Sequence, residues 1–153
     1  MKPVYKKTYK VSKTFNAPLE FVFNWCTDFQ EDDPKMVGSK NRRHLHEKTK
    51  VRVIYTVDGK KLPSGTDPVR VVWLRPPNAW HLETCGDGTE IGDYKLASLG
   101  KNKTRLDMVF SEIHNKKSDF QSKKEYKAET LDHWDRYGKF LERDFKASLR
   151  TSQ

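Results

Sequence analysis

The sequence predicts an α+β domain in which a series of antiparallel strands is followed by one long amphipathic helix. Two observations support this prediction. Short extended segments separated by turn residues fill the middle of the chain, and helical patterns occur only on either side of that series. Consecutive strands with short connections pair as antiparallel neighbours, whereas a parallel sheet needs helices between its strands. The 153 residues show no repeat and no linker composition, so we expect one domain over residues 1–153.

The long helix is predicted over Tyr126–Leu149. At about 100° per residue its apolar side chains share one narrow sector, and charged residues fill the rest of the surface. The apolar sector comprises Leu131, Trp134, Gly138, Leu141, Phe145 and Leu149. One face of this helix must therefore be buried against a large partner. Gly138 lies in the middle of that face, although glycine costs about 1 kcal/mol relative to alanine in a helix interior.

The chain begins with a predicted strand and a predicted helix. Tyr5–Phe15 alternates in places between apolar and polar side chains, which is typical of a half-buried strand. Asn16-Ala17-Pro18 marks a boundary, because asparagine caps helix N-termini and proline is tolerated in a first helical turn. A helix is predicted from Leu19 to about Thr27, and a second short helix or a loop between Asp28 and Gly38.

Six extended segments follow. Turn sequences such as Asp58-Gly59 and Gly86-Asp87-Gly88 separate them and favour tight connections between antiparallel strands. The segments are Asn41–Glu47, Val51–Val57, Val69–Leu74, Ala79–Cys85, Thr89–Leu99 and Thr104–His114. We expect them to form a meander against which the long helix packs.

The composition argues against several classes of protein. The chain carries 30 Lys+Arg against 21 Asp+Glu, for a net charge of +9, but the basic residues are scattered over predicted turns and strands. A solvated surface is therefore favoured over a nucleic-acid interface. No run of about 18 apolar residues predicts a membrane span, and no apolar segment follows the first lysines as in a signal peptide. We expect a cytoplasmic protein without integral membrane contact, in which Cys26 and Cys85 are free thiols rather than a disulfide.

One stretch of sequence resembles a known family. Val11–Phe23, with the sequence VSKTFNAPLEFVF, is similar to the first strand, the "AP" boundary and the first helix of the START/birch-pollen-allergen superfamily. This superfamily has the helix-grip fold and is also grouped as SRPBCC or polyketide cyclase/dehydrase-like proteins. The order of predicted elements matches over essentially the whole chain. The resemblance implies a curved antiparallel sheet of about 6–7 strands around the C-terminal helix, with two short helices after the first strand.

The resemblance also implies a function for the space between sheet and helix. Most members of the superfamily hold a lipid, sterol, polyketide or other apolar molecule in a cavity there, as carriers or sequestering proteins. Inward-facing side chains with apolar bodies and polar tips suit such a site, although ordinary core packing is the alternative for each of them. The ligand-binding candidates are Trp25, Tyr55, Trp73, Trp80, Leu82, Tyr94, Leu96, Met108, Phe110, Trp134, Tyr137, Gly138 and Leu141.

Gly138 has two explanations within this family. The missing side chain lets the helix approach the sheet closely, or it makes room where a ligand crosses the helix. The residues on their own favour neither explanation over the other.

Catalysis has less support in the sequence, which predicts no catalytic residue, no metal site and no cofactor. His81 and Glu83 share a strand face opposite Trp80, and His44 and His46 lack a third ligand at a supporting spacing. Some members of the superfamily are cyclases or dehydratases, so an enzyme acting on a polyketide-like substrate is the alternative. Its proton donor would be Tyr94 or Tyr137.

The expected partner is a small apolar ligand, with an anionic head group as one option. Lys123, Lys124 and Lys127 lie near the start of the long helix, and Lys127 projects onto the apolar sector. The buried face is therefore expected to stop near Leu131. A partner-regulating or nucleic-acid-associated role of the basic surface is a further alternative, and the expected oligomeric state is a monomer or a weak homodimer.

Overall fold

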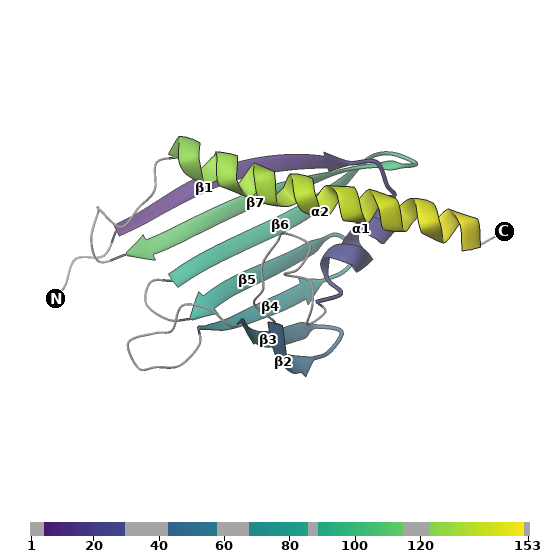
Figure 1. Ribbon diagram of the computed structural model, residues 1–153. Helices are drawn as coiled ribbons and strands as arrows, with labels where there is room; N and C mark the ends of the chain where they lie inside the picture. The colour runs from purple at the N-terminus through teal and green to yellow at the C-terminus, as the bar shows by residue number, and fades with distance from the viewer. Residues whose placement is uncertain (1–4, 30–42, 58–67, 86–88, 115–122, 152–153) are drawn as a thin grey trace.

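The computed structural model contains a seven-stranded antiparallel sheet, one short helix and one long helix (Figure 1). It describes residues 5–29, 43–57, 68–85, 89–114 and 123–151. The strands are β1 Tyr5–Phe15, β2 Arg43–Lys48, β3 Arg52–Val57, β4 Val69–Arg75, β5 Ala79–Cys85, β6 Thr89–Gly100 and β7 Lys103–His114. The helices are α1 Leu19–Cys26 and α2 Lys123–Thr151.

The strand order is β1-β7-β6-β5-β4-β3-β2, and every neighbouring pair is antiparallel. Strands β2 to β7 are therefore a meander, because each of them pairs with the next in sequence. The first strand joins the last one, from Tyr5 opposite His114 to Phe15 opposite Thr104. This arrangement confirms the α+β class and the predicted antiparallel series. The predicted second short helix lies almost entirely outside the described residues.

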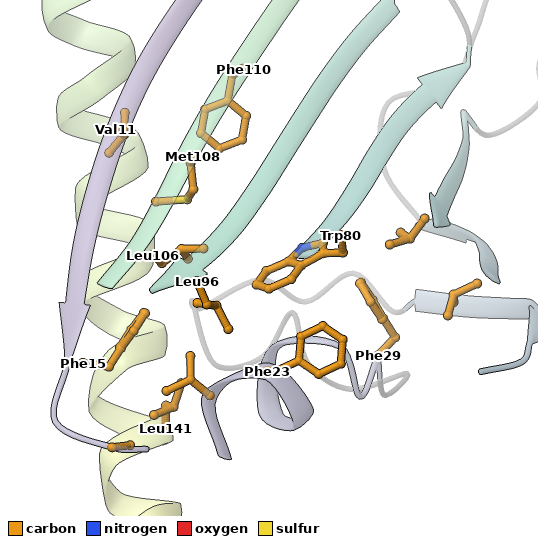
Figure 2. Close-up of a cluster of buried hydrophobic side chains, with 14 of the residues drawn as sticks. Val11, Phe15, Phe23, Phe29, Trp80, Leu96, Leu106, Met108, Phe110 and Leu141 are labelled. Carbon is orange, nitrogen blue, oxygen red and sulfur yellow. The ribbon is translucent and has the colours of Figure 1, made fainter. Parts of the chain in front are cut away.

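The long helix crosses the β1 side of the sheet, as Figure 1 shows. Gly138 is buried there, and a Cβ atom on it would lie 3.2 Å from Cε1 of Phe15 and 3.5 Å from Cε of Lys13. Leu141, which is fully buried, lies beside Phe15 (Figure 2). These contacts support the first explanation of Gly138, a close approach of the helix to β1.

Polar contacts fix the helix along its length. Lys13 Nζ of β1 donates to Asp135 Oδ1 at 2.5 Å, and the backbone N–H of Asn16 donates to Glu142 Oε1 at 2.7 Å. From α1, Trp25 Nε1 donates to Asp144 Oδ2 at 2.8 Å. The helix is thereby held to the first strand and to α1.

The predicted end of the buried face near Leu131 is wrong. Leu131 is 37% exposed, whereas Tyr126 is 8% exposed and stacks on Tyr9 with ring centroids 4.0 Å apart. Tyr126 and Thr130 are buried or half-buried, whereas Lys127 and Leu131 are exposed. The buried side of α2 at this end is thus shifted by one residue from the sector that the apolar periodicity predicts. At the other end Leu149 is 50% exposed, because the last turn extends beyond the first strand.

Candidate functional site

Antiparallel pairing arranges the side chains that face the helices in rows across the sheet, because directly opposed residues share one face. We name three of these rows by their character. The polar row consists of Tyr55, Arg70, Thr84, Glu90, Glu112 and Lys7. The apolar row consists of Val53, Val72, Leu82, Gly92, Phe110 and Tyr9. The aromatic row consists of Leu74, Trp80, Tyr94, Met108 and Val11.

Aromatic rings from the sheet and from both helices meet over these rows. Trp80 and Tyr94 stack with centroids 4.9 Å apart, and Tyr94 lies 6.2 Å from Trp134 of α2. From α1, Phe23 contacts Trp80 edge-on at 6.1 Å, and Trp25 contacts Tyr137 of α2 edge-on at 5.9 Å. Figure 2 shows Phe23 facing Trp80 from the α1 side of this interior.

A glycine determines how Tyr94 lies. A Cβ atom on Gly92 would be 2.9 Å from Cε2 and 3.2 Å from the hydroxyl oxygen of Tyr94. The ring therefore leans back over Gly92, and its hydroxyl points toward the polar row, in which Glu90 is the next inward residue of β6. Gly92 lets the ring occupy this position, which a side chain would block.

The Tyr94 hydroxyl stays protonated. Burial raises its pKa far above the usual value, the neighbouring Tyr55 and Glu90 raise it further, and Arg70 opposes them. The side chain nevertheless keeps part of its surface accessible, and no hydrogen bond joins its oxygen to another residue within the described ranges. Cys26 shows the same combination, because burial raises the pKa of its thiol while the residue stays half-buried. That thiol is therefore a poor nucleophile.

The predicted ligand-binding residues fall into three groups. Four are almost completely buried and act as core: Tyr55, Leu96, Met108 and Leu141 are at most 2% exposed. The second group lies between the sheet and the helices. In it Trp80 and Phe110 are 4% and 6% exposed, and the half-buried members are Trp25, Leu82, Tyr94, Trp134 and Tyr137. The third group lies outside this interior, because Gly138 faces β1 and Trp73 is on the outer face of the sheet.

The inward position expected for Trp73 is wrong. Trp73 pairs with His81, on the opposite face from Trp80 and Leu82, and the two rings lie 5.6 Å apart. Segment Val69–Leu74 has apolar residues on both of its faces, so the pairing with β5 decides which of them point inward.

His81 confirms the outward face that we expected for His81 and Glu83. Its Nδ1 lies 2.5 Å from Asp93 Oδ1, and its Nε2 lies 3.0 Å from Glu83 Oε1. Both ring nitrogens donate only when the imidazole is charged. Burial lowers the pKa of His81, but the contacts with the two carboxylates outweigh it and raise the pKa above the usual 6.5.

This contact makes the stability of the protein depend on pH. A raised pKa in the folded state stabilises the fold below about pH 6.5, and the contribution disappears as the pH rises through the raised value. The difference in unfolding free energy between wild type and His81→Gln should therefore be largest near pH 6 and shrink above it. Denaturant titrations at several pH values measure this difference, and a constant difference would contradict the proposed charge pairing.

The start of α2, where Lys123, Lys124 and Lys127 suggest an anionic head group, also packs against acidic residues of the sheet. Tyr126 donates to Glu90 Oε1 at 3.2 Å, and burial, Glu90 and Glu112 together raise the pKa of Tyr126. The polar row thus presents Glu90 and Glu112 together with Lys7 at this end, while Lys124 and Lys127 are exposed.

A groove of about 370 Å³ lies between α2 and β1. It is lined by Lys13, Phe15, Asp132, Asp135, Arg136, Gly138, Lys139 and Glu142. Of the predicted ligand-binding residues it includes Gly138, and charged side chains dominate its lining. The groove is therefore distinct from the aromatic interior.

Arg70, Phe23 and Cys26 also line this interior and were not among the predicted site residues. Arg70 had a usable signal, because it precedes Val72 and Leu74 by two and four positions on one strand and so shares their face. Within the described ranges, no cluster of three or more His, Cys, Asp or Glu residues is placed to hold a metal ion. Neither described helix is long and apolar enough to cross a bilayer.

The curved meander with a gripped C-terminal helix defines a helix-grip protein. No family model and no curated protein sequence matches the chain. Among solved structures, the chain is similar to the Zhui aromatase/cyclase from Streptomyces sp. R1128, with a TM-score of 0.70, 10% identity, and coverage of 91% of this chain and 95% of that one.

Two further structures are similar to the chain. Norcoclaurine synthase from Thalictrum flavum, solved with dopamine and hydroxybenzaldehyde, has a TM-score of 0.63 at 8% identity and covers 90% of this chain and 87% of its own. Ara h 8.0201 has a TM-score of 0.62 at 12% identity and covers 94% and 99%. All three belong to the START/birch-pollen-allergen superfamily, so the resemblance seen in the sequence is confirmed at the level of the fold.

Proposed function

We propose that this protein binds a small hydrophobic ligand between the sheet and α2, as a carrier or sequestering protein. The observation that supports this most is the state of the interior aromatic residues. Tyr94, Trp134, Tyr137 and Trp25 come from three elements, contact one another, and stay half-buried. Burial raises the pKa of Tyr94, and the part of its surface that stays accessible is available to a ligand.

The chemistry of this interior suits an apolar or aromatic molecule. Aromatic rings attract a bound ring by stacked and edge-on contacts of about 0.5–1.5 kcal/mol each. Removing roughly 250 Å² of apolar ligand surface from water contributes about 6 kcal/mol, before the entropic cost of association is subtracted. The net affinity is then set by how well the ligand fits and by its polar contacts.

Native mass spectrometry of the purified protein tests whether it carries such a ligand. The proposal predicts a second mass species, above the chain mass, that disappears when the protein is unfolded. An apo mass alone, together with no uptake of an added neutral apolar molecule, would contradict a carrier role.

An enzyme of the cyclase or dehydratase kind is the second candidate, and one observation favours it. The Tyr94 hydroxyl is held protonated over the interior and is not bonded to a described residue, so it is available as a donor to a substrate oxygen. Two of the similar structures are named as an aromatase/cyclase and a synthase.

Tyr94→Phe separates this candidate from simple binding. If Tyr94 is the proton donor, the variant should lose at least about 100-fold in turnover of a poly-β-ketone substrate while keeping its affinity for an apolar probe. Equal turnover by wild type and variant would exclude Tyr94 from this role.

A further inference from the structure

Arg70 places a positive charge on the inner face of the sheet. It shares the face of Val72, which is fully buried, and its neighbours across the strands are Tyr55 and Thr84. An arginine cannot lose its charge in a protein, and an arginine on a buried face is usually paired.

No such pair is present among the described residues. The Arg70 guanidinium lies 6.0 Å from the centroid of the Tyr55 ring, and no hydrogen bond or ion pair joins it to another described residue. The Arg43 guanidinium lies 4.7 Å from the centroid of the same ring, and Arg43 is 8% exposed. Two positive charges thus lie near Tyr55 at the β2–β4 side of the interior.

The Tyr94 hydroxyl and the Arg70 guanidinium lie toward the same row of the sheet. The Tyr94 ring leans over Gly92 toward the polar row, and Arg70 belongs to that row on β4. In keeping with this arrangement, the charge of Arg70 lowers the pKa of Tyr94 against the larger effect of burial. An oxyanion between them would accept hydrogen bonds from a guanidinium and from a phenol.

The rows of the sheet give this space a direction. The apolar and aromatic rows receive an apolar body, and the polar row lies beyond them at one end. Within the polar row Glu90 is two strands away from Arg70, which is about 10 Å at the usual strand spacing. Its carboxylate repels an anion from the β6 side and leaves the β4 side as the favourable end.

We propose that Arg70 anchors the oxyanion head group of an amphipathic ligand whose apolar body lies over the apolar and aromatic rows. This inference rests on the proposed function, because it names the ligand class for the same interior. It places the anion at β4 rather than at the lysines in the first turns of α2. The guanidinium offers a planar fork that binds an oxyanion through two N–H groups.

Two probes with one fluorophore test the anchor. 1-Anilinonaphthalene-8-sulfonate carries an oxyanion, and N-phenyl-1-naphthylamine is its neutral counterpart. Arg70→Gln should weaken binding of the sulfonate at least about tenfold and change binding of the neutral probe less than twofold. Arg75→Gln removes the same charge from an exposed position on the outer face of β4, and should leave both affinities within twofold. Arg70→Lys keeps the charge without the fork and should give an intermediate loss.

The outcomes distinguish the anchor from the proposed function. Equal effects of Arg70→Gln on the two probes, or an unchanged affinity for the sulfonate, would overturn the anchor while the binding function stands. If the wild-type protein binds neither probe, the anchor and the proposed function both fail. Thermal unfolding of each variant shows whether it is folded, and Arg70→Lys supplies a second variant if Arg70→Gln unfolds.

Discussion

Leu141→Ala is expected to lower the free energy of unfolding by about 2–5 kcal/mol. Leu141 is fully buried and lies beside Phe15 where α2 rests on the first strand. Alanine removes the three outer carbon atoms of the buried side chain and leaves a cavity, because the helix is fixed on both sides of this position. The close approach of Gly138 to Phe15 and the hydrogen bond from the Asn16 N–H to Glu142 limit how far α2 can move to fill that cavity. Urea titration followed by far-ultraviolet circular dichroism measures the loss.

Two leucines of the same helix are matched controls. Leu131 is 37% exposed and Leu149 is 50% exposed, so changing either one to alanine should cost well under about 1 kcal/mol. The simple helical projection places all three leucines in one sector, whereas the structure buries one of them. Similar losses for Leu131→Ala and Leu141→Ala would contradict the orientation of α2 described above.

Gly92→Ala is expected to damage the interior more than the fold. The added methyl group would lie 2.9 Å from the Tyr94 ring, which is confined by the stacked Trp80 and by Phe110 and Trp134. The ring must move, and we expect a stability loss of about 1–3 kcal/mol together with a loss of at least tenfold in affinity for a neutral apolar probe. Tryptophan fluorescence should change as well, because Tyr94 leaves the face of Trp80.

Gly100→Ala is the control for this substitution on the same strand. A Cβ atom on Gly100 would have no atom within 4 Å apart from its own chain neighbours, so the variant should keep both its stability and its probe affinity. If Gly92→Ala binds the probe as tightly as wild type, the position of Tyr94 over Gly92 does not shape the binding site.

The sequence was sufficient to predict the fold because each element had a local signal. Turn residues separate the strands, Asn16-Ala17-Pro18 precedes α1, and the apolar periodicity of α2 is strong. The resemblance of Val11–Phe23 to the superfamily then connected these elements into a gripped helix. None of these signals depends on contacts between distant residues.

The site was less predictable because it depends on register and on rotation of the helix. Trp73 was expected to face inward, but its pairing with His81 places it on the outer face of the sheet. The buried side of α2 passes through Tyr126, which an ideal projection puts outside the apolar sector. Arg70 was not among the predicted residues, although its place two residues before Val72 puts it on the same face of the strand.

The central claim is that an apolar molecule binds between the inner face of the sheet and α2. Titration of the protein with N-phenyl-1-naphthylamine tests it most directly when Leu82→Trp is compared with Val109→Trp. Leu82 is half-buried beside Gly92 in the apolar row, and Val109 is half-buried on the outer face. We predict saturable binding of one probe by wild type and by Val109→Trp, and a loss of at least tenfold for a folded Leu82→Trp. No saturable binding by wild type, or equal affinities of the two variants, would contradict an interior binding site.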